Sequence, residues 1–235
     1  RATLLKCLSH VQSVVERRNT IPILSNVLIE ASEGGKIKVT ATDLDLQVVE
    51  TFAISALGSI TYYVGITYVP AFLDATGTMP ETRALSISVL AALTVILVTP
   101  IIGFASDRFG RRPILIALAL GGILLPTGMF AVMVGGGAAT WTGAIVLAAL
   151  GGAVSAVGAV TTAEQFPGEG RLSGLALGAT TATAIFGGLT PLVAHLLVTK
   201  SGWAAAPGAM IACVALCVII VFWRMPETAP ARSRV

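Results

Sequence analysis

The side chains best placed for chemistry are a few ionisable and aromatic groups within long apolar runs of the chain. Only His195 is an ionisable group clearly inside such a run. Ionisable groups within a membrane are functional candidates by default, so His195 is a candidate contact for substrate or proton. The alternative is an interfacial histidine near Lys200. Tyr62 and Tyr63 are candidates to line a cavity, with packing of their rings as the simpler interpretation.

A compact charged motif lies between the second and third apolar runs. Asp107 can pair there with a nearby arginine or with a helix N-terminus. Gly103 favours close helix packing and Gly110 permits a tight turn, while Arg111 and Arg112 hold the loop at the membrane surface and attract lipid phosphates. The alternative is a basic turn with no further role. The candidate residues of this motif are Gly103, Ser106, Asp107, Arg108, Gly110, Arg111, Arg112 and Pro113.

A second motif surrounds the loop near residue 167. Glu164 and Arg171 flank this loop, and we expect them to pair with each other or with helix ends, as a gate. The candidate residues of this motif are Glu164, Phe166, Pro167, Arg171, Gly174 and Gly178.

Six apolar runs without charged residues must position these motifs. A helix needs about 20 apolar residues to cross about 30 Å of hydrocarbon. Runs of that length lie at residues 52–73, 84–106, 113–134, 141–163, 172–199 and 203–223. The sequence therefore predicts a mainly α, polytopic membrane protein rather than a soluble bundle.

The composition divides the chain near residue 50. Overall, 55% of the residues are hydrophobic and 11% are charged, against about 25% charged in a soluble domain. Residues 1–50 hold 6 basic and 6 acidic residues, whereas residues 51–235 hold 9 and 6. The net charge of +3 therefore comes from the apolar part, where basic residues indicate topology rather than a nucleic-acid surface.

The basic residues also predict an orientation. With six spans, the side that carries both termini holds all the Lys and Arg residues except Arg83 and Lys200. Because basic loops stay in the cytoplasm, we expect a multi-pass protein of the bacterial inner membrane with both termini cytoplasmic. The three cysteines lack metal-ligand spacing, and we expect no metal, no cofactor and no catalytic residue.

The two loop motifs are similar to those of a transporter family. Gly103-Phe-Ala-Ser-Asp-Arg-Phe-Gly-Arg-Arg-Pro113 resembles the signature cytoplasmic loop of the major facilitator superfamily, in the copy between transmembrane helices 8 and 9. The Glu164 motif and the closing Pro226-Glu227-Thr228 resemble the metabolite:proton symporter branch. That branch includes carriers of 2-oxoglutarate, citrate, shikimate, proline and betaine.

The resemblance covers residues 52–228 and implies helices 7–12, the C-terminal half of a carrier. It implies that the substrate is a small polar metabolite, such as an organic acid or a betaine- or proline-like solute, and that a proton is the coupling ion. Because the site of such a carrier lies between two halves, we expect no transport without a complementary N-terminal half.

The first 50 residues carry a different pattern. Apolar residues at helical spacing predict a helix over 3–18. β-rich segments at 27–31 and 36–42 flank a Glu-Gly-Gly turn signal, and a third short strand is predicted at 46–50.

This segment resembles the N-terminus of the bacterial DNA polymerase III beta sliding clamp, through LLKCLSHVQSVVERRNTIPILSNVLIEAS and TATDLDLQVVE. The resemblance implies a small α+β fragment whose helix faces DNA, with Lys6, Arg17 and Arg18 as candidate phosphate contacts. We favour solvated charges at these positions and no DNA contact, since less than half of one clamp domain is present. Two alternatives to a carrier half therefore remain, namely a replication-clamp fragment and a fusion without function.

Overall fold

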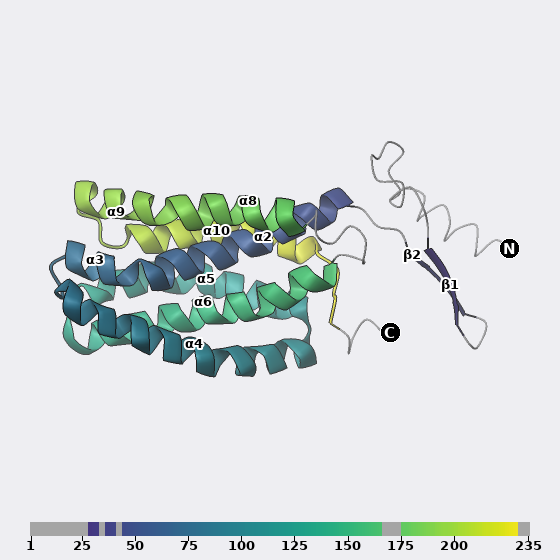
Figure 1. Ribbon diagram of the computed structural model, residues 1–235, viewed down its shortest axis with the longest axis horizontal. Helices are drawn as coiled ribbons and strands as arrows, with labels where there is room; N and C mark the ends of the chain where they lie inside the picture. Colours follow the sequence, from purple (N-terminus) through teal and green to yellow (C-terminus); the bar gives the residue numbers. More distant parts are fainter. Residues whose placement is uncertain (1–27, 33–35, 41–43, 166–174, 230–235) are drawn as a thin grey trace. The chain divides into compact units, whose positions relative to one another are not determined.

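The computed structural model describes residues 28–32, 36–40, 44–165 and 175–229. The chain divides into two compact units, Arg1–Val48 and Val49–Val235. Figure 1 labels the elements of both units.

The first unit contains a β-hairpin. Strand β1 (Leu28–Ser32) pairs antiparallel with β2 (Lys36–Thr40), with Leu28 opposite Thr40 and Ser32 opposite Lys36. The hairpin predicted from the two β-rich segments is therefore present, with slightly different ends. The predicted helix over 3–18 lies outside the residues that the structure describes.

The predicted third strand at 46–50 is wrong, because these residues belong to helix α2 (Leu44–Tyr62). Their alternating apolar pattern suits a strand, but β preference depends strongly on tertiary context. Here the helix of the first apolar run continues back through them. Glu50 is only 8% exposed and finds a partner on another helix, Gln165.

The second unit contains six helical segments long and apolar enough to cross a membrane, as the six runs predict. The first, Gln47–Thr67, joins α2 to the short π-helix η2 (Tyr63–Thr67), and α3 (Val69–Ala75) follows it. Three long helices come next: α4 (Glu81–Phe109), α5 (Arg111–Met133) and α6 (Gly137–Gln165). Helix α10 (Ala206–Arg224) is the last.

The fifth segment, Ala176–Ser201, is not a regular α-helix. It consists of π-helix η3 (Ala176–Thr180), α8 (Thr181–Thr183), π-helix η4 (Ala184–Leu189) and α9 (Thr190–Ser201). π-helical turns are rare and frequently lie at functional sites. Among the described residues of this unit, η2, η3 and η4 are π-helical, and η2 and η4 contact each other.

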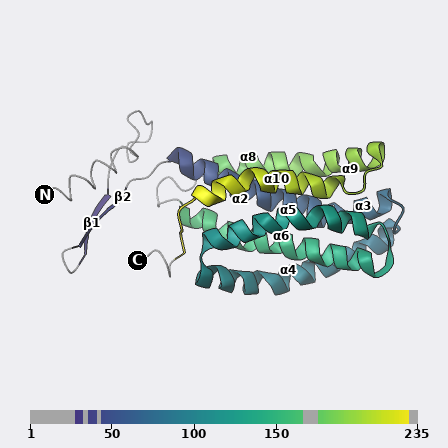
Figure 2. The same cartoon turned by 180° about the vertical axis from the view of Figure 1, so that it is seen from behind.

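The helices of the second unit run lengthwise beside one another (Figures 1 and 2). Helix α5 packs along α10 and α6, and α6 also packs along α4. Gly208 permits a close approach of α10 to α5, since a Cβ atom there would lie 2.5 Å from the Thr127 Cα of α5. Buried aromatic rings, including Phe72, Phe130 and Phe222, fill the interior.

Candidate functional site

A buried arginine joins the adjacent ends of three helices in the second unit. Arg111, in the first turn of α5, is 4% exposed. Its guanidinium lies 2.6 Å from the Asp107 carboxylate at the end of α4 and 3.1 Å from the Glu164 carboxylate at the end of α6. Its Nε also donates to Glu164 Oε2 at 3.3 Å. One guanidinium therefore binds two carboxylates from two other helices.

A third carboxylate closes this group from the chain segment after α10. The backbone N–H groups of Arg111 and Arg112 donate to Glu227 at 2.7 and 3.3 Å. A carboxylate at these positions satisfies unpaired donors at the start of α5 and complements the helix dipole. Gly110 has a φ of +104°, and a Cβ atom there would lie 2.9 Å from Glu227 Cδ. Glycine is thus required both by the turn and by the carboxylate.

Two hydroxyls complete what we call the charge cluster, defined as Asp107, Arg111, Glu164 and Glu227 with these hydroxyls. Ser106 Oγ accepts from the Arg111 guanidinium at 2.5 Å and donates to the Gly103 carbonyl at 2.8 Å. Thr228 Oγ1 donates to Glu164 Oε2 at 2.8 Å.

The burial of Arg111 and the exposure of its carboxylate partners allow the charge cluster to hold the helix ends together and also allow these ends to move apart. A buried charge is tolerated only when it is paired and hydrogen-bonded. Arg111 is fully buried, whereas the side chain of Asp107 is 62% exposed and that of Glu164 is 23% exposed. The carboxylates are therefore close to water and can be solvated if the helix ends move apart.

Two predictions about the charged motif need correction. Arg111 is buried against carboxylates, so it is not a site for lipid phosphates. Arg112 is partly exposed and donates to the Trp223 carbonyl of α10, and its attraction to lipid phosphates stays a prediction. Gly103 does not mediate close packing, because a Cβ atom there would meet no described atom within 4 Å.

The remaining residues of the two motifs have simpler environments. The Arg108 guanidinium lies 5.8 Å from the centre of the Phe109 ring, and Pro113 is in the first turn of α5. Gly178 is buried in η3. Glu164 pairs with Arg111, which was not predicted. Its predicted partner, Arg171, lies outside the described residues, as do Phe166, Pro167 and Gly174.

Sequence reasoning did not identify Glu227 and Thr228 as site residues. Their only signal was the Pro-Glu-Thr sequence directly after the last apolar run. Because 116 residues separate Glu227 from its partner Arg111, the contact depends on the packing of α10 along α5.

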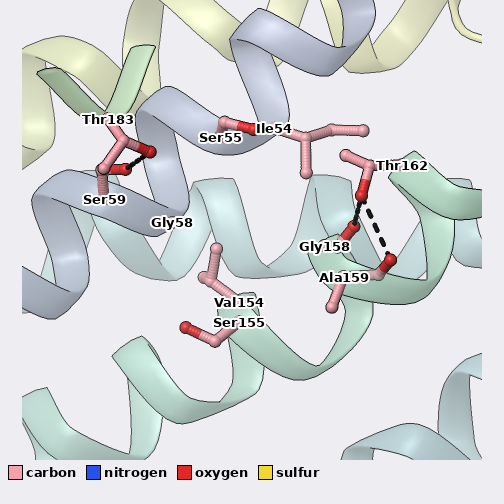
Figure 3. Close-up of a pocket in the computed structure, with 10 residues that line it drawn as sticks. All are labelled: Ile54, Ser55, Gly58, Ser59, Val154, Ser155, Gly158, Ala159, Thr162 and Thr183. Atoms are coloured by element: carbon pink, nitrogen blue, oxygen red, sulfur yellow. Dashed lines mark hydrogen bonds between the residues drawn. The ribbon is translucent and has the colours of Figure 1, made fainter. Parts of the chain in front are cut away.

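A second feature, a hydroxyl-lined pocket of about 240 Å³, lies between α2, α6 and α8 (Figure 3). None of its described lining residues is charged. The lining residues are Ile54, Ser55, Gly58, Ser59, Val154, Ser155, Gly158, Ala159, Thr162 and Thr183. The signal that could have revealed it is the spacing of Ser55 and Ser59, four residues apart in an apolar run.

The hydroxyls of the pocket differ in whether they are already bonded. Ser59 donates to Thr183 at 3.1 Å, and Thr162 donates to the Gly158 carbonyl at 2.9 Å. Within the described part of the chain, Ser55 and Ser155 have no such partner. Their hydroxyls are therefore available to a solute.

The predicted tyrosine candidates follow the pocket along the first span, whereas His195 lies on a different helix. Tyr62, one turn after Ser59, is 44% exposed. Its ring centre lies 5.5 Å from that of Tyr63, with the planes at 76°. His195 lies elsewhere, on α9, with its ring edge-on to Tyr68 at 6.3 Å.

Comparisons with known proteins match the two parts of the chain to different families. The model of the Major Facilitator Superfamily matches residues 51–235, and that of the DNA polymerase III beta subunit, N-terminal domain, matches residues 1–98. A beta sliding clamp of Caulobacter vibrioides is 62% identical over 63 residues, which are 26% of this chain and 17% of the clamp.

The transporter relatives match the second part. A citrate-proton symporter of Klebsiella pneumoniae is 28% identical over 167 residues, which are 70% of this chain and 38% of the symporter. A proline/betaine transporter of Salmonella typhimurium is 30% identical over 175 residues, covering 73% of this chain and 34% of that protein.

The fold of the second unit also has a solved counterpart. A crystal structure of a double-tryptophan XylE mutant aligns with a TM-score of 0.58 and 18% identity, over 78% of this chain and 45% of that one. The chain thus spans less than half the length of each of the proteins named above.

Proposed function

The chain belongs to the Major Facilitator Superfamily through residues 51–235, and on that premise we propose that it is the C-terminal half of a proton-coupled carrier for a small polar metabolite. Alone, this half should be inactive. It aligns with citrate-proton and proline/betaine carriers over only 34–38% of their length. The other half of the transport pathway would come from a complementary N-terminal half.

The pocket is the observation that carries this proposal. Ser55 and Ser59 lie near the middle of the span Gln47–Thr67. In secondary transporters of this kind the substrate site lies near the middle of the membrane, between two repeats. Ser155 and Thr183, on two other helices, are exposed rather than covered by the rest of the chain. One wall of a site, open on one side, is what a single half would supply.

The charge cluster suits a cytoplasmic gate. By the distribution of basic residues, the ends of α4 and α6 face the cytoplasm in a bacterial inner membrane, with both termini on that side. Closing would hold Asp107 and Glu164 on Arg111, and opening would expose the carboxylates to water. His195 and the two tyrosines Tyr62 and Tyr63 remain candidates for substrate or proton contact.

Reconstitution tests the proposal. Proteoliposomes would hold the chain alone, or the chain with the N-terminal six-helix half of a proline/betaine carrier, under an imposed proton gradient. We expect labelled proline to accumulate only in the second preparation, and a protonophore to abolish the accumulation. Uptake by the chain alone would contradict its inactivity, and no gradient-driven uptake of proline or citrate in either preparation would contradict the carrier assignment.

The clamp-like segment supports a second candidate, retention on DNA, because its match of 62% identity is close. We propose that it has no clamp activity, since the matched residues cover only 17% of the clamp. Salt-dependent retention of the full chain on DNA, lost on Arg17→Ala with Arg18→Ala, would contradict this.

A further inference from the structure

The proposed transport site leaves the chemical class of the solute open, because its relatives are named for citrate and for proline and betaine. Citrate is a polycarboxylate, whereas proline and betaine are zwitterions with one carboxylate. The side chains around the pocket distinguish these classes by charge and by aromatic content.

The pocket can bind one carboxylate but offers nothing to offset several. Ser55 and Ser155 provide unbonded hydroxyl donors, and none of the ten lining residues is charged. Transfer of a charge from water into an uncharged protein site is unfavourable without a paired opposite charge. A solute that carries its own cation partly meets this requirement, and a solute with several carboxylates does not.

The tyrosine pair provides a surface for that cation. Tyr62 and Tyr63 follow Ser59 by three and four residues, so they lie about 5–6 Å further along the helix. Their rings stand nearly perpendicular, at 76°, and Tyr62 is 44% exposed. Aromatic faces within about 6 Å attract ammonium groups, and weakly hydrated alkylammonium groups are the preferred ligands of such rings.

The backbone of η4 fixes one of these rings. A Cβ atom on Gly187 would lie 2.8 Å from Tyr63 Cε2, closer than real Cβ contacts. The contact is possible because residue 187 is a glycine, and it holds the Tyr63 ring between η2 and η4. The aromatic surface is therefore oriented before a solute arrives.

We infer that the hydroxyls of the pocket and the Tyr62–Tyr63 pair form one half-site for a small N-alkylated zwitterion, with the carboxylate at the hydroxyls and the ammonium group at the rings. This inference rests on the proposed function, since it concerns the same site. It excludes a polycarboxylate as the preferred solute of this half.

Saturation-transfer difference NMR on the full chain in nanodiscs tests the inference, because the method detects the weak binding expected of a half-site. The probes are trimethylglycine and citrate at equal concentration. We expect saturation of the N-methyl protons and little saturation of the citrate methylene protons. Tyr63→Leu should lower the N-methyl signal about three- to ten-fold, and Tyr63→Phe should retain it.

Three further variants make the result specific. Ser155→Ala should weaken the signal, and Gly187→Ala should weaken it by displacing the Tyr63 ring. Tyr68→Phe, at a 4% exposed tyrosine outside the half-site, should leave it unchanged. Circular dichroism spectra that match that of the parent chain would show that each variant is folded. If Tyr63→Leu does not fold, the N-methyl signals of Tyr63→Phe and Gly187→Ala are compared instead.

Several outcomes would overturn the inference. Equal N-methyl saturation in Tyr63→Leu and the parent chain would show that the Tyr63 ring does not contact the ammonium group. Stronger saturation of citrate, lowered by Ser155→Ala, would overturn the solute class while leaving a transport site in place. Saturation of neither probe would also overturn it, and the reconstitution experiment would then judge the proposed function separately.

Discussion

Replacing Arg111 with methionine should destabilise the membrane unit at the charge cluster. The change keeps an unbranched apolar side chain but removes the guanidinium that binds Asp107 and Glu164. Breaking a buried ion pair by removing one partner costs about 3–5 kcal/mol. Without Arg111, Glu164 would still accept the hydrogen bond from the Thr228 hydroxyl, and its side chain is partly exposed. We therefore expect the loss of the Arg111–Glu164 pair to cost near the lower end of that range.

The Asp107 contact adds little to this total. Its side chain is 62% exposed, and exposed ion pairs contribute about 0.2–1 kcal/mol. We therefore expect Arg111→Met to lower the free energy of unfolding by about 3 kcal/mol. Arg112→Met is the matched control, because Arg112 is the next residue but is partly exposed, and among the described residues its guanidinium donates only to the Trp223 carbonyl. We expect a loss below about 1 kcal/mol for the control.

Unfolding in mixed micelles by a denaturing detergent would measure both variants. A double-mutant cycle of Arg111→Met with Glu164→Gln isolates the pair, and we expect a coupling energy of at least about 1.5 kcal/mol. Equal stability of Arg111→Met and Arg112→Met, or a coupling energy below about 0.5 kcal/mol, would show that the cluster does not hold these helix ends together.

Three further changes test other contacts. Glu227→Ala should cost about 1 kcal/mol and speed amide exchange in the first turn of α5, because it removes a helix cap; unchanged exchange would count against capping. Gly208→Leu should prevent α10 from packing on Pro126 of α5 and yield a chain that fails to fold in micelles, whereas Gly128→Leu, at a position with no described atom within 4 Å of a Cβ, should fold. In proteoliposomes that hold the chain and the N-terminal half, Asp107→Asn should abolish proton-driven uptake. Normal uptake by this variant would show that Asp107 is not part of the gate.

The six spans and the hairpin were predictable because each depends on a local pattern. A run of about 20 apolar residues specifies a span whatever its neighbours are, and alternation around a Gly-rich turn specifies a hairpin. The Glu227 contact could not be predicted, since it joins residues more than 100 positions apart through helix packing. The close approach of Gly187 in η4 to the Tyr63 ring in η2 also could not be predicted, since it joins two separate spans.

The change in composition at residue 50 lies within one continuous helix, α2. By sequence, Glu50 lies where the chain changes from a charged to an apolar composition. In the structure it is a buried member of the membrane unit, where Gln165 Nε2 donates to its carboxylate at 2.8 Å and Thr51 donates to Gln165 at 2.9 Å. A buried, unpaired polar group would destabilise α2 at this point. The junction is therefore tolerated because α2 continues through it as one helix and α6 supplies the hydrogen-bond partner. The change in composition consequently falls inside helix α2, two residues after the structural boundary at Val48.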